Sequence, residues 1–575
     1  MTVGTWILSA RERTEGEAFQ YKLNGQWIGV TWPEYCQKVV SVAMSLKQNG
    51  LNPRDHVGLM CSTRWEWSVL DMAILGSNAI TVPMYPNLSD DDFVYIVDHS
   101  EIKILIIEDD ALLEQVERTK SRFARPVFVY VIEKINFSMD VKEPDQEAFY
   151  IGCKNLKSED IATIIYTSGT TGQPKGVVLL HEAIASEVID GFELFNVKKT
   201  DRALTFLPFA HVLGRLEHWG SCYNGHCLAY AESVEKIRSN LKEVKPDFMI
   251  AVPRIFEKVY AGILAQIETQ KFKQTMFQQA LEAAVEIEKY RKTKSAIPWG
   301  LLLKYEALNK LALQPIRDAF GGKLRFAVSG GAPLDSQLTS FFTNCGVPVL
   351  EGYGLSETTG AITVNALGDS LPGTVGKPIG DVQIKIAADG EILVKSKKCL
   401  KEYYKNTEET ARSIQDGYFA TGDIGELTDS GFLRITDRKK DLIKTAGGKY
   451  VAPQKLEGLL KMEPLISNVL IHGDQKKYIV ALISCDEDQL KKWASNNGIS
   501  FESFEEIYSN QLFKARIQKH IQSVNSHLAS FESIKKYEIL RDQWTVENGS
   551  LTQSLKVKRK QLEKQYLGLI ETIYD

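Results

Sequence analysis

Residues 166–176 read YTSGTTGQPKG, a stretch rich in glycine and hydroxyl side chains that holds a single cation, Lys175. It follows an apolar run, ATII at 162–165, which predicts a β-strand. Glycine lets the backbone approach a ligand closely, and successive exposed N–H groups form an anion-binding concavity. The threonine and serine hydroxyls add further donors. The stretch therefore predicts a strand followed by a loop that binds a polyphosphate.

A P-loop NTPase is the first alternative for such a loop, and the neighbours of Lys175 exclude it. The Walker motif requires glycine before its lysine and serine or threonine after it. Here Pro174 precedes Lys175 and Gly176 follows it. Because a helix does not start smoothly through QPKG, direct transfer of a γ-phosphoryl group is not expected.

Strand and helix patterns alternate along the first half of the chain. HVGLMC at 56–61 and AITVPMY at 79–85 have the character of strands, and 65–78 between them predicts a helix. KILIIED at 103–109 and VFVYVIE at 127–133 continue the series. This alternation is typical of α/β folds, with parallel sheets and helices on both sides.

The pattern changes in the second half of the chain. From about residue 370, short strands and Gly/Asp turns predict a small β unit. After about 442, strands at 468–473 and 478–485 are mixed with helical segments, which predicts a compact α+β domain.

Composition limits the class of protein. The chain has 69 Lys+Arg against 73 Asp+Glu, a net charge of −4, and no basic arm, so nucleic-acid binding is not expected. Eight scattered cysteines form no CxxC pair, and the amino terminus lacks a secretory pattern. No apolar run reaches the ~20 residues that span a bilayer. We expect free thiols in the reducing cytoplasm.

Two further patterns suggest functions that ordinary packing explains better. His218, Cys222, His226 and Cys227 share a spacing that would suit one helical face, but Gly220 and Gly225 are expected to interrupt that helix, and no common zinc pattern matches. Residues 270–294 predict a helix with lysine and arginine towards its ends. A solvated basic face is favoured there, and a membrane-surface patch is the lesser alternative.

Several motifs, taken in order, resemble those of the adenylate-forming ligase superfamily, which includes acyl-CoA synthetases, luciferases and peptide-synthetase adenylation domains. They are YTSGTTGQPKG, LPFAH (207–211), VSGGAP (328–333), EGYGLSETTG (351–360), YFATGDIGEL (418–427) and DRKKDLIKTAGGKYVAPQKLE (437–457). The resemblance covers nearly the whole chain. It implies an N-terminal adenylation domain over 1–437, with parallel α/β sheets and a small β-barrel unit. A hinge at 438–441 and a small mobile α+β domain over 442–575 complete the implied fold.

The resemblance also implies a two-step reaction. A carboxylate attacks the α-phosphorus of ATP to give an acyl-adenylate and pyrophosphate, and a thiol, usually that of coenzyme A, then displaces AMP. Mg²⁺ is expected on Thr167 and Glu357. The residues expected to bind nucleotide or co-substrate are Thr167, Ser168, Gly169, Thr170, Thr171, Gly172, Lys175, Gly330, Gly331, Ala332, Glu351, Gly352, Tyr353, Gly354, Ser356, Asp423, Arg438 and Lys444.

The residues that the resemblance assigns to catalysis are Lys556, His211, Thr358 and Lys440. Lys556 lies in LTQSLKVKRK, where Leu555 stands at a position that is usually glycine, as in long-chain acyl-CoA synthetases with an LTPTLK-like segment. The three basic residues after it compete for the same role: Lys558, Arg559 and Lys560.

The acid is inferred from resemblance alone. LPFAHVLGRLEHWG resembles the LPLAH segment of long-chain fatty acyl-CoA synthetases, with Arg215 where some bacterial relatives have a gating tryptophan. A long-chain fatty acid–CoA ligase is the first hypothesis. A fatty acyl-AMP ligase that loads a carrier-protein thiol and a catalytically weak acyl- or nucleotide-binding relative are the alternatives. Analogy leaves a homodimer and peripheral membrane contact open.

Overall fold

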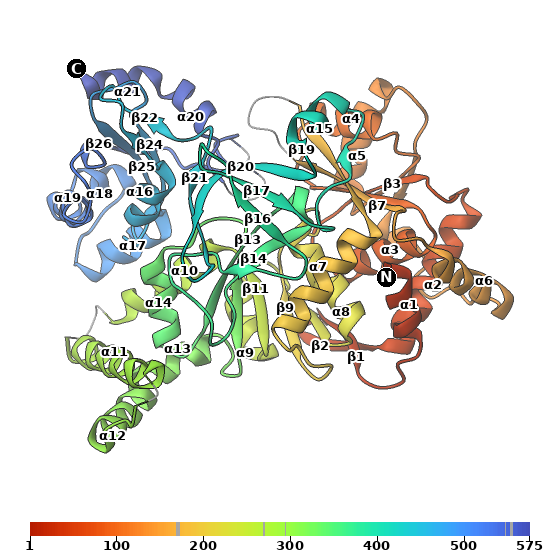
Figure 1. Cartoon of the computed structure of the whole chain (residues 1–575), viewed down its shortest axis with the longest axis horizontal. Coiled ribbons are helices and arrows are strands. Elements are labelled where there is room, and N and C mark those ends of the chain that lie inside the picture. The colour runs from red at the N-terminus through yellow and green to blue at the C-terminus, as the bar shows by residue number, and fades with distance from the viewer. Residues whose placement is uncertain (168–172, 268–270, 294, 547, 553–555) are drawn as a thin grey trace.

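The computed structural model describes residues 1–167, 173–267, 271–293, 295–546, 548–552 and 556–575. It contains a large N-terminal α/β domain and a smaller C-terminal domain (Figure 1). Two large sheets with helices around them form the N-terminal domain, as the alternating pattern predicts. Among the described helices, none is both long and apolar enough to cross a membrane.

The first large sheet carries the glycine- and threonine-rich stretch at its antiparallel end. Within the described residues its strand order is β18-β8-β7-β4-β3-β5-β6. The central and distal strands run parallel, whereas β7, β8 and β18 pair antiparallel. The strands, in chain order, are β3 (His56–Met60), β4 (Ile80–Met84), β5 (Ile104–Ile107), β6 (Phe128–Val131), β7 (Ile161–Thr167), β8 (Lys175–Leu180) and β18 (Glu402–Tyr403).

The second large sheet has the order β15-β14-β13-β12-β11-β9-β10-β1-β2 in the described part of the chain. Its middle strands are parallel and both of its ends are antiparallel, so both sheets are mixed, not purely parallel as the alternation predicts. The strands are β1 (Glu17–Leu23), β2 (Gln26–Thr31), β9 (Arg202–Thr205), β10 (Cys227–Tyr230), β11 (Phe248–Ala251), β12 (Phe326–Ser329), β13 (Val349–Leu355), β14 (Gly360–Val364) and β15 (Lys377–Pro378).

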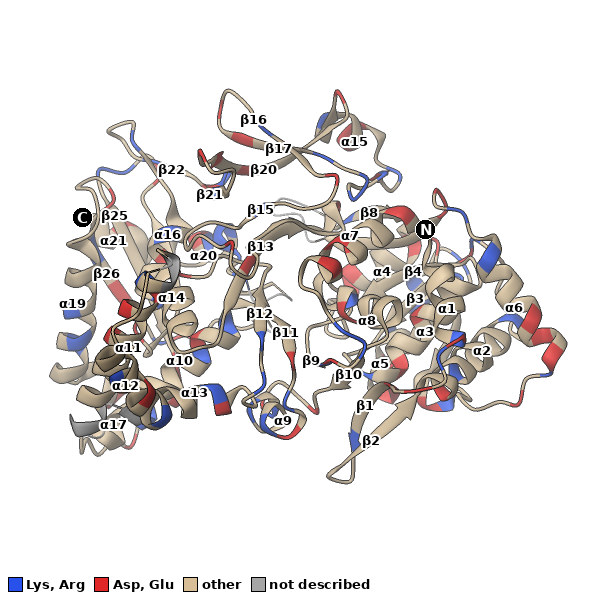
Figure 2. Ribbon diagram, turned by 60° about the horizontal axis from the view of Figure 1, so that its bottom comes forward, with Lys and Arg blue, Asp and Glu red and all other residues tan. Residues whose placement is uncertain are grey.

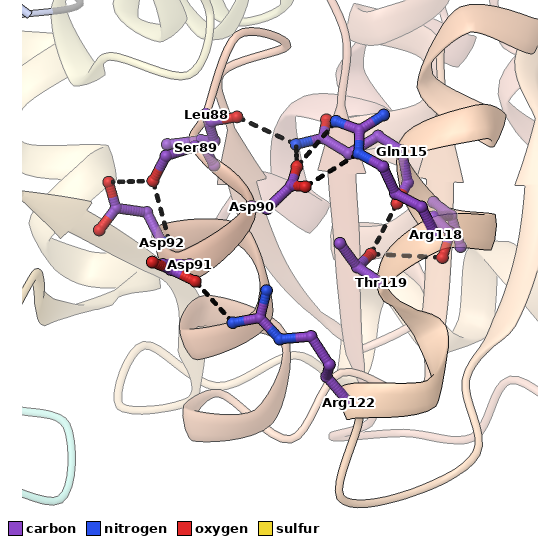
Figure 3. A network of polar contacts seen from close by, with 10 residues as sticks. Leu88, Ser89, Asp90, Asp91, Asp92, Gln115, Arg118, Thr119 and Arg122 are labelled. Atoms are coloured by element: carbon purple, nitrogen blue, oxygen red, sulfur yellow. Dashed lines mark hydrogen bonds and ion pairs between the residues drawn. The ribbon is translucent and has the colours of Figure 1, made fainter.

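Helices on the sheet faces bury a shared apolar core. Residues of both sheets and of α1 (Val3–Arg11), α2 (Trp32–Gln48), α3 (Trp65–Gly76), α7 (His181–Leu194) and α8 (Val212–Asn224) form one cluster. On the far side of the first sheet, α4 (Asp90–His99) and α5 (Asp110–Thr119) are joined by Asp90, which accepts from Arg118 at 2.8 Å and from Gln115 at 2.9 Å (Figure 3).

The helix α8 corrects one sequence expectation. It continues through Gly220, whose hydrogen atoms face the Phe192 ring so closely that an added Cβ would lie 1.9 Å from Phe192 Cζ. Gly225 ends the helix with φ +89°, a left-handed conformation that suits glycine. Gly220 is therefore a site of close packing and not a break. His218 and Cys222 are buried on this helix, and all eight cysteines are free thiols, as expected.

The small β unit lies between the large sheets and the C-terminal domain. Its described strands are β16 (Gln383–Ile386), β17 (Glu391–Lys395), β19 (Ile414–Gln415), β20 (Tyr418–Leu427) and β21 (Leu433–Arg438). They pair antiparallel in the order β16-β17-β20-β19, with β21 on β20. This path is open within the described residues, so the unit is an antiparallel sheet and not the closed barrel that the resemblance implies. Figure 2 shows it as a separate layer at the rim of the molecule.

The C-terminal domain has its own apolar core, which begins at Ile443. Its sheet joins β24 (Ile466–His472), β25 (Ile479–Cys485) and β26 (Ile534–Leu540), while β22 (Ile443–Lys444) and β23 (Tyr450–Val451) form a hairpin. Helices α16 (Pro453–Leu460), α17 (Glu487–Asn496), α18 (Phe504–Ser509), α19 (Gln511–Asn525), α20 (Arg559–Gln565) and α21 (Leu567–Tyr574) surround these strands. A hinge at 438–441 stays a prediction.

Candidate active site

The hairpin of β7 and β8 presents the glycine- and threonine-rich stretch. Thr167 and Lys175 face each other in register at the base of the hairpin. The expected phosphate ligands between them, Ser168, Gly169, Thr170, Thr171 and Gly172, lie outside the described residues. The Lys175 ammonium forms an ion pair with Glu409 of α15 (Thr407–Ser413) and lies 5.4 Å from the centre of the Tyr403 ring.

The strands β12 and β13 carry the next expected group. Gly330, Gly331 and Ala332 follow the carboxyl end of β12, and Gly331 has φ +81°, which permits the tight bend there. Glu351 on β13 is buried and accepts a hydrogen bond from Thr339 at 3.1 Å. Burial raises the pKa of Glu351 to about 7.

The turn after β13 brings a carboxylate next to the hairpin of β7 and β8. In the short helix η4 (Ser356–Thr358), Glu357 accepts a hydrogen bond from the Tyr403 hydroxyl at 3.1 Å. Tyr403 also borders Lys175, so Glu357, Tyr403 and Lys175 come together from three separate segments. Burial raises the pKa of Glu357 because it disfavours the charged carboxylate, and a cation bound nearby would stabilise that charge.

Close backbone packing and internal hydrogen bonds fix the shape of this turn. A Cβ on Gly354 would lie 1.5 Å from the Gly360 carbonyl oxygen, so only glycine fits. Thr358 is fully buried; its hydroxyl accepts from Leu355 N–H and donates to the Gly360 carbonyl, each at 2.8 Å. The Thr358 hydroxyl is thus engaged within the turn, while Ser356 and Gly352 lie beside it.

A polar cluster at the edge of the small sheet faces this turn. Asp423 on β20 accepts a hydrogen bond from the Tyr353 hydroxyl at 2.6 Å. Arg438 on β21 is in register with Asp423, and its Nε lies 3.6 Å from Asp423 Oδ1. Burial raises the pKa of Asp423, while the Tyr353 hydrogen bond and the Arg438 charge act to lower it.

Lys556 reaches this cluster from the C-terminal domain. Two hydrogen bonds join its backbone to Thr552: Lys556 N–H donates to Thr552 Oγ1 at 3.0 Å, and Thr552 N–H donates to the Lys556 carbonyl at 2.7 Å. Burial and the Arg438 charge lower the pKa of Lys556 to about 8, against the opposing effect of Asp423 and Glu357. The basic residues that follow Lys556 behave differently, since Lys558 and Lys560 are exposed and Arg559 pairs with Glu457 inside its own domain.

His211 faces the same space from the start of α8. Its Nδ1 accepts a hydrogen bond from Leu213 N–H at 3.2 Å, which leaves the ring neutral. Burial, with the charge of Lys556, lowers the pKa of His211 to about 4. The imidazole of His211 is therefore neutral at physiological pH, within the range of the Lys556 charge.

The two lysines near the expected hinge lie in different places. Burial and the Arg438 charge lower the pKa of Lys440. The Lys175 charge also lowers this pKa and the Asp423 charge raises it, so Lys440 belongs to the cluster. Lys444 is exposed on the β22–β23 hairpin, with its Nζ 5.7 Å from the centre of the Tyr450 ring. In this domain arrangement Lys444 lies apart from the site.

The structure adds residues that the sequence does not point to. Tyr403 and Glu409 come more than 200 positions after Lys175, in a segment without a recognisable motif, and only the pairing of β18 with β8 brings them to the site. A buried network also supports α8. Asp71 on α3 pairs with Arg215 at 2.7 Å and accepts from the Trp219 ring N–H at 3.0 Å.

Comparisons of the sequence with known proteins identify the family. Residues 8–404 match the family model described as AMP-binding enzyme, and residues 440–575 match the AMP-binding enzyme C-terminal domain. The chain is 34% identical to long-chain-fatty-acid–CoA ligase FadD15 of Mycobacterium tuberculosis, covering 97% of this chain and 94% of that one. It is 30% identical to long chain acyl-CoA synthetase 6, peroxisomal, of Arabidopsis thaliana, covering 99% and 84%.

Solved structures agree in fold. The O-succinylbenzoate coenzyme A synthetase of Bacillus subtilis, in complex with ATP and magnesium ion, superposes with a TM-score of 0.70 at 19% identity, covering 97% of this chain and 99% of that one. The adenylation domain of a carboxylate reductase from Mycobacterium chelonae gives a TM-score of 0.75 at 20% identity, covering 100% and 91%.

Proposed function

This chain belongs to the AMP-binding enzyme family, and on that premise we propose that it is an ATP-dependent long-chain fatty acid–CoA ligase. The observation that carries the proposal is the position of Lys556. A lysine from the small C-terminal domain lies with Asp423, Arg438 and Glu357 of the large domain, in a site bordered by Lys175. The names of the similar proteins support the substrate class.

The first step joins two anions. An oxygen of the fatty acid carboxylate forms a bond to the α-phosphorus of ATP, and the bond from that phosphorus to the bridging oxygen breaks, so that pyrophosphate leaves. Because like charges repel, cationic and hydrogen-bonding groups fixed around the phosphates lower the barrier. We assign this role to Lys175 at the phosphate hairpin and to Lys556 between carboxylate and α-phosphate. An ammonium on a long stem suits such bridging.

The nucleoside would lie against the edge of the small sheet. The Asp423 carboxylate can accept hydrogen bonds from two ribose hydroxyls. Arg438 and the Tyr353 hydroxyl already contact this carboxylate, and they orient it. Gly330 and Gly331 allow the backbone after β12 to approach the adenine.

The residues present fit a magnesium ion. Mg²⁺ prefers oxygen ligands and keeps several waters, so that the Glu357 carboxylate and the Thr167 hydroxyl suffice as protein ligands. The buried Glu357 carboxylate, with its raised pKa, is the kind of group that a cation stabilises. When bound, Mg²⁺ would neutralise phosphate charge.

The second step needs a different set of groups in the same place. Coenzyme A loses its thiol proton to solvent, its sulfur forms a bond to the acyl carbonyl carbon, and the bond from that carbon to the AMP oxygen breaks, so that AMP leaves. We propose that rotation about residues 438–441 withdraws Lys556 and brings the Lys444 hairpin to the site. Lys444 and Lys556 both belong to the C-terminal domain, yet of these two only Lys556 is at the site in this arrangement, which supports such a rotation. Homodimer formation stays a prediction.

One assay tests the proposed function. Purified enzyme receives palmitate, Mg²⁺ and ATP, with and without coenzyme A, and pyrophosphate, AMP and thioester are measured. Pyrophosphate together with palmitoyl-CoA is the expected result, and release of ADP would overturn the proposal.

The same assay separates the alternatives. Since carboxylate reductase domains share this fold at low identity, the fold does not decide the acceptor thiol. Adenylate that only a carrier-protein thiol discharges would indicate an acyl-AMP ligase. Absence of pyrophosphate with every acid would indicate a binding protein.

A further inference from the structure

A fully buried lysine lies between helix α7 and the turn at 355–361, which we name the Glu357 turn. Lys398 belongs to the segment between β17 and β18, and none of its side chain is exposed. Its Nζ lies 3.0 Å from Glu187 Oε2 and 2.9 Å from Asp190 Oδ2. Residues three positions apart share one side of a helix, so α7 presents two carboxylates to one ammonium. We name these three side chains the Lys398 triad.

Lys398 keeps its charge although it is buried. Burial lowers the pKa of Lys398, but the charges of Glu187 and Asp190 outweigh burial and raise this pKa above its ordinary value. Taking such charges out of water is costly, and replacing a buried ion pair by apolar side chains is often neutral or stabilising. Stability alone therefore does not explain a lysine at this position. The contacts that the triad makes beyond itself give a reason for it.

Two hydrogen bonds join the triad to the Glu357 turn. Glu187 Oε1 accepts from Ala361 N–H at 2.6 Å. The backbone carbonyl of Lys398 accepts from the Thr359 hydroxyl, also at 2.6 Å. Glu187 uses its other oxygen, Oε2, for the ion pair with Lys398. One carboxylate therefore connects the buried ammonium to the backbone of the turn.

The backbone of the Glu357 turn depends on support from outside. Thr359 has φ +59°, a left-handed conformation that is an outlier for a β-branched residue. Such a conformation persists only where the surrounding structure holds it. Thr359 is fully buried and donates to the Lys398 carbonyl, while Leu400 N–H donates to the Glu357 carbonyl at 2.7 Å. The segment 398–400 thus holds the turn at the strained residue and at Glu357.

We propose that Glu187 and Lys398 are positioning residues, which hold the Glu357 turn in place for the magnesium ion of the nucleotide complex. This inference rests on the proposed function, in which Glu357 is a ligand of that ion. Lys398 keeps Glu187 ionised, and a hydrogen bond to an ionised acceptor is roughly twice as strong as one between neutral groups. Glu187 thereby fixes Ala361 and, through the turn, the carboxylate of Glu357.

Asp190 separates this role from an ion pair that only stabilises the core. It pairs with the same ammonium as Glu187. Within the described part of the chain, however, Asp190 makes no hydrogen bond to the Glu357 turn. Loss of either carboxylate would weaken the pairing with Lys398, whereas only changes at Glu187 would loosen the turn.

Calorimetry of nucleotide binding to the purified full chain tests the proposal. The probe is α,β-methylene-ATP, in which carbon replaces the oxygen that bridges the α- and β-phosphorus, so that no pyrophosphate leaves. The measured quantity is the ratio of the Kd in EDTA to the Kd in Mg²⁺. Neither fatty acid nor coenzyme A is present. A chain that makes no palmitoyl-CoA can therefore still pass this test, and the two results are separate.

Three substitutions within the triad provide the comparison. Glu187→Met removes both the charge and the acceptor but keeps an unbranched side chain of similar size. It should lower the ratio about tenfold, as is usual when a group that supports a metal ligand is lost. Glu187→Gln keeps an oxygen that can accept from Ala361 N–H, and Asp190→Asn is the matched control on the other carboxylate. Both should leave the ratio close to that of the wild type.

Thr359→Val tests the second hydrogen bond and keeps a β-branched side chain. It removes the donor to the Lys398 carbonyl and should lower the ratio in the same direction as Glu187→Met. The urea midpoint of each variant records its folding. Binding of AMP in EDTA needs no metal ion and should be unchanged in every folded variant. If Glu187→Met does not fold, Thr359→Val is judged by the same ratio.

Three results would overturn the proposal. The first is a wild-type ratio in both Glu187→Met and Thr359→Val. The second is a ratio that Glu187→Gln and Asp190→Asn lower as much as Glu187→Met does, as an ion pair that only stabilises the core would give. The third is a wild-type chain that binds the probe equally well in EDTA and in Mg²⁺.

Discussion

The lowered pKa of Lys556 gives a prediction about the pH dependence of adenylation. Burial and Arg438 lower this pKa from the ordinary lysine value of 10.5 to about 8. A lysine with a lowered pKa loses its charge as the pH rises through that value, and the proposed role needs the charged form. Adenylation should therefore be fully supported below pH 7 and should decline above pH 8.

The size of the decline follows from the fraction of Lys556 that is protonated. With a pKa of about 8, that fraction falls about tenfold between pH 7 and pH 9. At saturating palmitate, the kcat/KM for ATP reports groups of the enzyme form to which ATP binds, so it should fall by the same factor. Lys556→Ala should lower the rate of adenylation by about 10²–10³-fold, which is the usual effect of removing one group that stabilises charge in the transition state.

The assay is pyrophosphate release at saturating palmitate, with ATP varied from pH 6 to pH 10. Buried Glu217 also titrates near this range, because burial raises its pKa to about 8. Lys556→Arg separates the two groups, since arginine keeps its charge at all these pH values. The decline should disappear in Lys556→Arg, whatever its absolute rate.

Thioester formation from supplied palmitoyl-AMP and coenzyme A is the internal control, and Lys556→Ala should affect it much less than adenylation. The reasoning is refuted if Lys556→Arg declines above pH 8 as the wild type does. It is equally refuted if Lys556→Ala lowers both half-reactions alike.

Three other perturbations test the structure around the site. Arg215→Met leaves the Asp71 carboxylate buried without its main countercharge, so we expect a loss of about 3–5 kcal/mol of stability, seen as a lower urea midpoint; an unchanged midpoint would contradict the buried pair. Burial raises the pKa of Glu217 to about 8, so the free energy of unfolding of the wild type falls as the pH rises from the ordinary pKa of a glutamate towards 8. Glu217→Gln removes that fall. The variant should gain urea resistance relative to wild type at pH 9 but not at pH 5, and equal differences at both would argue against it. Gly354→Ala places a Cβ 1.5 Å from the Gly360 carbonyl oxygen, so pyrophosphate release should be abolished even where circular dichroism shows a folded chain; near-normal release would mean that the turn can adapt.

The sequence predicts much of the fold because its signals are local. The strands at 56–61, 79–85 and 478–485 are found within one or two residues of those positions, as β3, β4 and β25. Alternation of short apolar runs with helical patterns depends on neighbouring residues alone. Antiparallel sheet ends and the open path of the small sheet were not predictable in this way, because strand pairing depends on contacts between distant segments.

The same division holds for the site. Motifs predicted to bind ligand through their own backbone, such as the stretch from Tyr166 to Gly176 and the turn around Gly354, are recognisable from the residue types alone, since tight turns and close approach require glycine. The sequence alone also excluded a Walker-type loop at Lys175. The resemblance assigns catalysis to Lys556, with the basic residues after it as competitors. The tertiary structure brings Lys556 into the range of the Asp423 and Arg438 charges and leaves Lys558 and Lys560 exposed.

Local chemistry thus predicted a phosphate loop and identified the class of fold, and tertiary structure decided which residues lie around that stretch. Glu409 and Tyr403 reach Lys175 only through the pairing of β18 with β8, and the charge of Asp423 acts on Lys556 only because the C-terminal domain lies in this orientation. Charges act through space and not along the chain. Burial and neighbouring charges set every shifted pKa in the site, and both exist only once the chain has folded.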